Sequence, residues 1–300
     1  TATTTTTATT TATTTATKRA DTGCCPGSLA LAPARRMRHT DAMTPPVYFI
    51  LGIPGAGRRE VLVDLVENEY GADNPAAVWV HAGEPESADT EKLAAAGHVA
   101  LGTWDFRGDT PEADVAAPDA VPPSDIFVLL HGLSNPVDQL EAWKRWLQRT
   151  GRDVGRILCV VHCAFVEDNA DAEAWYDACI HFSDVVLLNR RDEASNKWMN
   201  AFLKKYEKAF YPCHFDFVKK GRVRNPAFVL DPVPRRLSLL FEEMEERAEL
   251  DLEIVDDETG EIVTEEEDDE RINLDDDPYL ARYPSGQRRK RIPDIAALLK

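Results

Sequence analysis

The stretch from residue 48 to residue 69, YFILGIPGAGRREVLVDLVENE, decides the fold. Four apolar residues that suit a buried strand lead into a glycine-rich turn, and the turn leads into a segment whose apolar residues recur at helical spacing. In such a strand, turn and helix, the glycines let backbone N–H groups turn inward, and the start of the helix adds partial positive charge. This stretch is therefore a candidate binding site for a phosphate group.

The spacing of Gly52 and Gly57 matches the G-x-x-x-x-G frame of a phosphate-binding loop, but the next two positions do not. That loop normally continues with Lys, which reaches the phosphates, and then with Ser or Thr, whose hydroxyl ligates magnesium. Here Arg58 can still bond a phosphate, although its planar fork differs from an ammonium group. Arg59 cannot ligate a metal cation. The alternative is a glycine-rich turn that holds no ligand.

The predicted phosphate site consists of the loop residues and the two arginines that follow them: Gly52, Gly55, Ala56, Gly57, Arg58 and Arg59.

Short apolar runs alternate with longer amphipathic stretches through the rest of the chain. We expect strands at 47–51, 77–81, 124–130, 156–161 and 184–188, and helices at 58–69, 136–149, 171–180 and 193–210. Continuously apolar strands are typical of a parallel sheet that is buried on both faces. The predicted fold class is a three-layer α/β/α domain over residues 43–232, closed by a hairpin or edge pair around residues 219–221.

Both ends of the chain differ from this domain in composition. Residues 1–42 open with a run of Thr and Ala and show no hydrophobic periodicity, so we expect a low-complexity, disordered leader that lies upstream of a natural start at Met43. After the domain we expect a helix at 233–250. Residues 251–300 are then expected to form an acidic, largely disordered tail with a short hairpin and a terminal helix.

The charge and the cysteines restrict the class of protein. The net charge is −18, and residues 242–278 alone hold 20 Asp and Glu against two Arg. Such a segment repels nucleic-acid phosphates, so we expect no nucleic-acid partner. No apolar run approaches the roughly 20 residues of a membrane span, so we expect no membrane either. The six cysteines include no CxxC pair, which argues against a zinc ribbon and a disulfide framework and favours the cytoplasm.

Three later segments carry a resemblance to a known family. Residues 132–136, GLSNP, are similar to the end of an E-T-T-G-L-A-D-P motif, residues 160–162, VVH, to V-V-D-A, and residues 189–192, NRRD, to N-K-x-D. Their order and spacing resemble the CobW family of P-loop G proteins, with its HypB-like and UreG-like nucleotide-binding domains. The resemblance covers residues 43–232 and implies GTP or GDP as the ligand.

The resemblance also assigns roles to residues. It implies that Asn189, Arg190 and Asp192 face the guanine base, although Asn and Asp would equally suit the cap of a helix that begins near Glu193. The family places a carboxylate where this chain has Leu129. Its C-x-C-C metal motif is missing between residues 94 and 109, and so is its usual C-terminal domain. Magnesium binding is thus in doubt, no zinc site is evident, and no catalytic residue can be named.

Three functions remain open at this stage. The favoured one is a degenerate guanine-nucleotide-binding domain, or pseudo-GTPase, with weak or absent hydrolysis. The first alternative is an active GTPase or metallochaperone-type enzyme in which another residue replaces the missing magnesium ligands. The second is an interaction scaffold that binds no nucleotide and recruits a protein partner through the acidic tail or the C-terminal helix.

Overall fold

The computed structural model describes residues 44–106, 114–242 and 277–299. The chain divides into two units, residues 1–42 and residues 43–300, and all of the described residues belong to the second. The expected leader and the acidic stretch with its expected hairpin lie outside the described residues.

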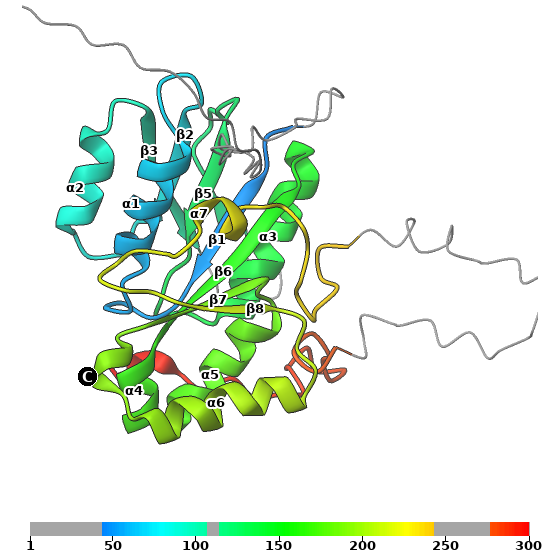
Figure 1. Ribbon diagram of the computed structural model, residues 1–300. Coiled ribbons are helices and arrows are strands. Elements are labelled where there is room, and N and C mark those ends of the chain that lie inside the picture. The colour runs from blue at the N-terminus through cyan, green and yellow to red at the C-terminus, as the bar shows by residue number, and fades with distance from the viewer. Residues whose placement is uncertain (1–43, 107–113, 243–276, 300) are drawn as a thin grey trace, which may run out of the picture. The chain divides into compact units, whose positions relative to one another are not determined.

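The second unit is built on one eight-stranded sheet with the order β4-β3-β2-β5-β1-β6-β7-β8 (Figure 1). Every neighbouring pair is parallel except β3 and β4. This confirms the predicted α/β fold with a mainly parallel sheet. The strands are β1 (Val47–Leu51), β2 (Ala76–His81), β3 (Val99–Phe106), β4 (Val115–Ala116), β5 (Asp125–Leu129), β6 (Val154–His162), β7 (Val185–Asn189) and β8 (His214–Phe217).

Helices cover both faces of the sheet. On one face α1 contacts α2 and α7, and on the other α3 and α5 pack together, with α6 joined to α5 by the bond from Lys205 to Asp177. The helices are α1 (Arg58–Glu69), α2 (Ala88–Ala95), α3 (Pro136–Thr150), α4 (Cys163–Asp168), α5 (Ala170–His181), α6 (Asn196–Lys208) and α7 (Pro226–Val229). Asn135 caps α3 by accepting a hydrogen bond from the N–H of Val137.

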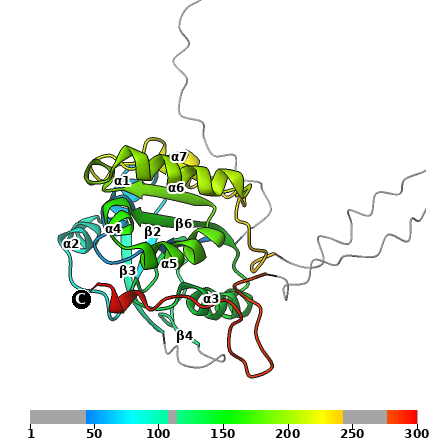
Figure 2. The same cartoon turned by 90° about the horizontal axis from the view of Figure 1, so that it is seen from below.

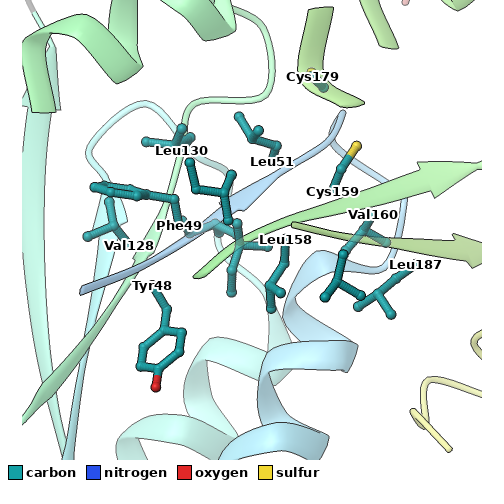
Figure 3. Close-up of a cluster of buried hydrophobic side chains, with 14 of the residues drawn as sticks. Tyr48, Phe49, Leu51, Val128, Leu130, Leu158, Cys159, Val160, Cys179 and Leu187 are labelled. Carbon is teal, nitrogen blue, oxygen red and sulfur yellow. The ribbon is translucent and has the colours of Figure 1, made fainter. Parts of the chain in front are cut away.

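The central strands are apolar on both sides because both sides are covered. All five residues of β1 are buried. Tyr48 and Phe49 are consecutive on this strand and point to opposite faces (Figure 3), where Phe49 packs against Trp143 of α3. Cys159 and Cys163 are buried free thiols, and His162 caps α4 with its ring. The two cysteines therefore serve the core, and His162 serves a helix end.

The chain reverses its direction of travel across the sheet at β1, which lies between β5 and β6. After β1 the chain continues to β2, which lies on the β5 side of β1. After β5 it continues to β6, which lies on the opposite side of β1. Ligands of open α/β sheets bind beside the carboxyl ends of the strands at such a switch point. Because β1 ends at Leu51, the loop 52–57 lies at this position.

The C-terminal part of the chain differs from the expectation. Residues 231–242 contain no helix, and the remainder of the expected helix at 233–250 lies outside the described residues. Residues 277–299, which we had assigned to the tail, pack on the domain along α3 and α5 (Figure 2). Asp277 bonds to His181 of α5, and Arg288 bonds to Asp138 of α3. In place of a terminal helix there is one 3₁₀ turn, Ile295–Ala297, with Ile295 buried.

The edge beyond β7 also differs in detail. A single strand, β8, pairs in parallel with β7, and the expected hairpin is reduced to a tight turn with one bridge between Lys219 and Arg222. Val223 follows the turn but is buried, and its N–H donates to Asp64 of α1 instead of to a second strand. Among the described residues, no helix combines the length and apolarity that a membrane crossing requires.

Candidate functional site

At two positions of the loop between β1 and α1, only glycine can adopt the backbone conformation that is observed. Gly52 has a φ of 133°, and a Cβ there would lie 2.4 Å from the carbonyl oxygen of Val160. Gly57 has a φ of 86°, and a Cβ there would lie 2.2 Å from the side-chain nitrogen of Asn189. A side chain at either position is therefore excluded both by strain and by collision.

The loop leaves a row of N–H groups without protein acceptors. Gly57 is the N-cap of α1, and no side chain caps this helix. The first N–H to close a helical hydrogen bond is that of Val61, which donates to the carbonyl of Gly57. Within the described residues, the N–H groups of Gly57, Arg58, Arg59 and Glu60 donate to no acceptor. Such groups at a helix start attract an anion.

The predicted phosphate ligand Arg58 is already bound within the protein. Its guanidinium donates to the carbonyl of Leu130 at 2.6 Å and to both carboxylate oxygens of Glu84 at 2.8 and 2.9 Å. The Glu84 carboxylate also accepts from Arg59 at 3.2 Å and from the N–H of Gly132 at 3.0 Å. A phosphate can therefore bind Nη2 of Arg58 only by displacing Glu84.

The Glu84 carboxylate is almost completely enclosed, with 1% of its side chain exposed. Burial by itself raises the pKa of Glu84, but the charge and hydrogen bonds of Arg58, the N–H of Gly132 and the charge of Arg59 outweigh it, so the pKa lies below its ordinary value. Glu84 is thus held ionised. Sequence analysis did not single out this residue, which follows β2 in a polar loop.

Two stacked histidines support the segment that carries Glu84. The rings of His81 and His131 lie 4.2 Å apart at the ends of β2 and β5, and His81 accepts the N–H of Gly83. The N–H of Glu84 donates to the carbonyl of His81. Burial lowers the pKa of both imidazoles, and for His81 the charge of His131 lowers it further. The pair is therefore neutral near pH 7.

The predicted base-binding residues lie together but have different partners. Asn189 is buried, donates to the carbonyl of Ala56 at 2.8 Å and accepts the N–H of Arg190. Arg190 is in the left-handed conformation and bonds to Glu60 at 2.8 Å. Asp192 is exposed in a 3₁₀ turn, Arg191–Glu193.

The structure excludes the alternative role of Asn189 and Asp192 as helix caps. The helix that follows them begins at Asn196 and not near Glu193, and its N-cap is Ser195, whose hydroxyl accepts the N–H of Trp198. Asn189 instead joins the end of β7 to the loop 52–57.

The residues around the loop do not fit a magnesium ion. Arg59 stands where the loop would present a hydroxyl, and Leu129 is fully buried at the end of β5, where the family has its carboxylate. The carboxylates near the loop are already paired. Glu84 is bonded to Arg58 and Arg59, Glu60 to Arg190 and Asp89 to Lys92. In the part of the chain that the structure describes, no group of three or more His, Cys, Asp or Glu side chains is placed to hold a metal.

A hollow of about 150 Å³ opens over the loop. Small-molecule pockets typically measure about 300–1,000 Å³, so a nucleotide would need this hollow to widen. Its lining includes Pro54, Gly55, Gly57, Arg58, Arg59, Glu60, Pro85, Ser87, Asp89 and Arg190. Counting Glu84 behind the arginines, three positive and three negative side chains meet here, and the site has little net positive charge.

The sequence matches no protein-family model and no curated protein. Three solved structures with a similar fold are the hydrogenase maturation factor HypB from Archaeoglobus fulgidus, the zinc-bound YjiA GTPase from E. coli and the signal recognition particle receptor FtsY from Elizabethkingia anophelis in complex with GDP. Their TM-scores are 0.38, 0.34 and 0.41, and their identities are 12%, 14% and 13%. The alignments cover 58%, 64% and 70% of this chain, and 81%, 67% and 66% of those chains. The resemblance to the CobW family stays a prediction.

Proposed function

We propose that the protein binds a guanine nucleotide at residues 52–59 and hydrolyses it slowly or not at all. The observation that carries this proposal is the row of N–H groups from Gly57 to Glu60, which lie at the start of α1 and have no acceptor among the described residues. A loop at a switch point with free N–H groups is suited to hold the phosphates of a nucleotide.

The base side supports a guanine nucleotide. Asn189 ties its loop directly to Ala56 of the phosphate loop, so a ligand on one loop would lie close to the other. The exposed carboxylate of Asp192 can accept hydrogen bonds from the N–H groups of a guanine ring. The planar guanidinium of Arg190 can pack against such a ring.

Slow or absent hydrolysis is supported by what surrounds the phosphates. Phosphoryl transfer depends on a cation at the outer phosphates and on a residue that positions the attacking water. Arg59 and Leu129 supply neither, and the Glu84 carboxylate is bound to arginines. An efficient GTPase would need these groups from elsewhere.

The balance of charge at the site favours a second candidate, an interaction scaffold that binds no nucleotide. Arg58, Arg59 and Arg190 are each paired with an acidic side chain of the same domain. A site whose arginines are all neutralised has less attraction for a highly charged ligand.

A titration of the purified chain with fluorescent GDP, GTP and ADP, with and without magnesium, tests the proposal when phosphate release is followed in parallel. We expect guanine-selective binding that changes little when magnesium is removed, and phosphate release far slower than that of ordinary GTPases. Turnover at an enzymatic rate would refute the loss of hydrolysis. Absence of binding at millimolar nucleotide would leave the scaffold.

The base site is tested by Asp192→Asn, with Glu193→Gln as the matched control because Glu193 is exposed in the same turn. We expect Asp192→Asn to weaken GDP binding without affecting ADP binding or the thermal midpoint. Equal GDP affinities for wild type and both variants would remove Asp192 from the base site.

A further inference from the structure

The carboxylate of Glu84 occupies a cage of donors that belongs to the phosphate loop. Two arginines at the start of α1 and one backbone N–H converge on it, through two contacts from Arg58, one from Arg59 and one from Gly132. Guanidinium groups and a loop N–H are also the donors that bind phosphate oxygens. The cage is therefore suited to any anion of this size.

The cage lies where the loop enters α1. Arg58 holds the position of the lysine that reaches the β- and γ-phosphates in a phosphate-binding loop. Gly132 comes from the end of the neighbouring strand β5 and packs on the loop so closely that a Cβ would lie 2.7 Å from the carbonyl oxygen of Gly52 and 2.9 Å from Arg58. Glu84 enters between them from the segment after β2. By contrast, the N–H groups of residues 57–60 stay free for inner phosphates.

We propose that the Glu84 carboxylate takes the place of a terminal phosphate, so that the folded site accepts a nucleoside diphosphate and disfavours the triphosphate. The inference rests on the proposed function, since it specifies which nucleotide that site takes. A diphosphate would bind the free N–H groups beside Glu84 once the hollow over the loop widens. A third phosphate would have to displace Glu84 from all four contacts and leave its negative charge close to the phosphates.

Glu84 is more elaborately bound than a simple ion pair requires. One arginine is sufficient to neutralise a carboxylate, yet this one also draws on a second arginine and on a backbone N–H of another strand. Burying an ion pair carries a desolvation cost that the pairing barely offsets. Occupation of a phosphate position explains why donors from the start of α1 and from the turn after β5 are directed at the same anion.

The experiment measures dissociation constants for GDP and GTP, without magnesium, on the full chain and on Glu84→Gln and Glu84→Ala. Glu86→Gln is the matched control, because Glu86 is exposed in the same loop. We expect wild type and the control to bind GDP more tightly than GTP by about ten- to a hundredfold, which corresponds to one hydrogen bond to a charged group. We expect the ratio to fall towards one in both Glu84 variants.

A second measurement uses inorganic phosphate in thermal unfolding. Phosphate should raise the midpoint of Glu84→Ala more than that of wild type or Glu86→Gln, because only in this variant can it also refill the cage. If Glu84→Ala does not fold, the more conservative Glu84→Gln and the wild-type ratio still decide the matter.

The possible outcomes separate the two proposals. Equal GDP and GTP affinities in wild type, or a preference for GDP that survives in both Glu84 variants, would overturn the role of Glu84 while nucleotide binding stands. If wild type binds neither nucleotide but a Glu84 variant binds GTP or is stabilised by phosphate, the role of Glu84 is supported and the proposed function of the wild-type chain fails. If no form of the chain binds nucleotide or phosphate, both proposals are wrong.

Discussion

The side-chain amide of Asn189 donates a 2.8 Å hydrogen bond to the main-chain carbonyl of Ala56 and so joins the end of β7 to the phosphate loop. We expect Asn189→Ala to lower the free energy of unfolding by about 1–3 kcal/mol, because it leaves a buried carbonyl without its donor. It should also weaken nucleotide binding, since the loop loses its support. Urea unfolding and GDP titration measure the two effects.

Asn196→Ala is the control for this variant, because Asn196 is exposed at the start of α6. We expect it to change the free energy of unfolding by less than about 0.5 kcal/mol, as surface substitutions usually do. If the two variants behave alike, the bond to Ala56 does not support the loop.

The ion pair of Glu84 gives stability a particular dependence on pH. Because the pKa of Glu84 is lowered in the folded state, its contribution is complete above about pH 4.5, the ordinary pKa of the group, and is lost as the pH falls through the folded pKa. Glu84→Ala should cost about 3–5 kcal/mol at pH 7, because it leaves a buried positive charge unpaired. Urea unfolding of wild type and variant at pH 7, 5, 4 and 3 should show the difference shrinking only in acid. A difference that stays constant would contradict this account.

The stacked histidines predict a second dependence on pH, in a higher range. The pKa values of His81 and His131 are both lowered on folding, chiefly by burial, so the unfolded chain takes up protons first. Stability should therefore be complete above about pH 6.5 and decline below it, with each histidine adding at most about 1.4 kcal/mol per pH unit to the slope. His131→Gln should reduce the slope between pH 6.5 and 5. An unchanged slope would exclude the pair as its source.

Tyr279 offers a test of how the C-terminal segment is held. Its ring is 1% exposed and contacts His181, while its hydroxyl is buried and has no hydrogen-bond partner among the described residues. Tyr279→Phe should be neutral or stabilising by up to about 1–3 kcal/mol, because it removes an unsatisfied polar group. Tyr279→Ala should cost about 3–5 kcal/mol, as is usual for a buried aromatic ring. Thermal unfolding of both variants decides this, and a clear loss with Phe would reveal a partner for the hydroxyl.

The residue pattern of a segment correctly predicted the strands and helices that depend mainly on that segment's own sequence. The apolar runs of β1, β5, β6 and β7 identified strands that are buried on both faces, and Asn135 with Pro136 identified the start of α3. The pattern failed for α2 and β3. Only Leu93 of α2 is buried, and β3 has exposed residues near its start, so neither segment shows a strong periodicity.

The sequence predicted the loop of the candidate site but not the residues that contact this loop from other parts of the chain. The spacing of Gly52 and Gly57 predicted a phosphate-binding loop, and the residue types at 189 and 192 predicted a base-binding segment; both stay predictions. Glu84 was missed because it lies 26 residues from Arg58 in a polar segment, and its role comes entirely from tertiary contacts. The lack of a lysine at position 58 was visible in the sequence, but the partner of the arginine that replaces it was not.

The hydroxyl of Ser238 lies 2.6 Å from the carboxylate of Asp277, so two residues that are 39 positions apart in the sequence are neighbours in the fold. Closing a longer loop costs little, about 0.6 kcal/mol for each doubling of its length. A change in the number of residues between these two positions should therefore alter the stability of the fold only slightly.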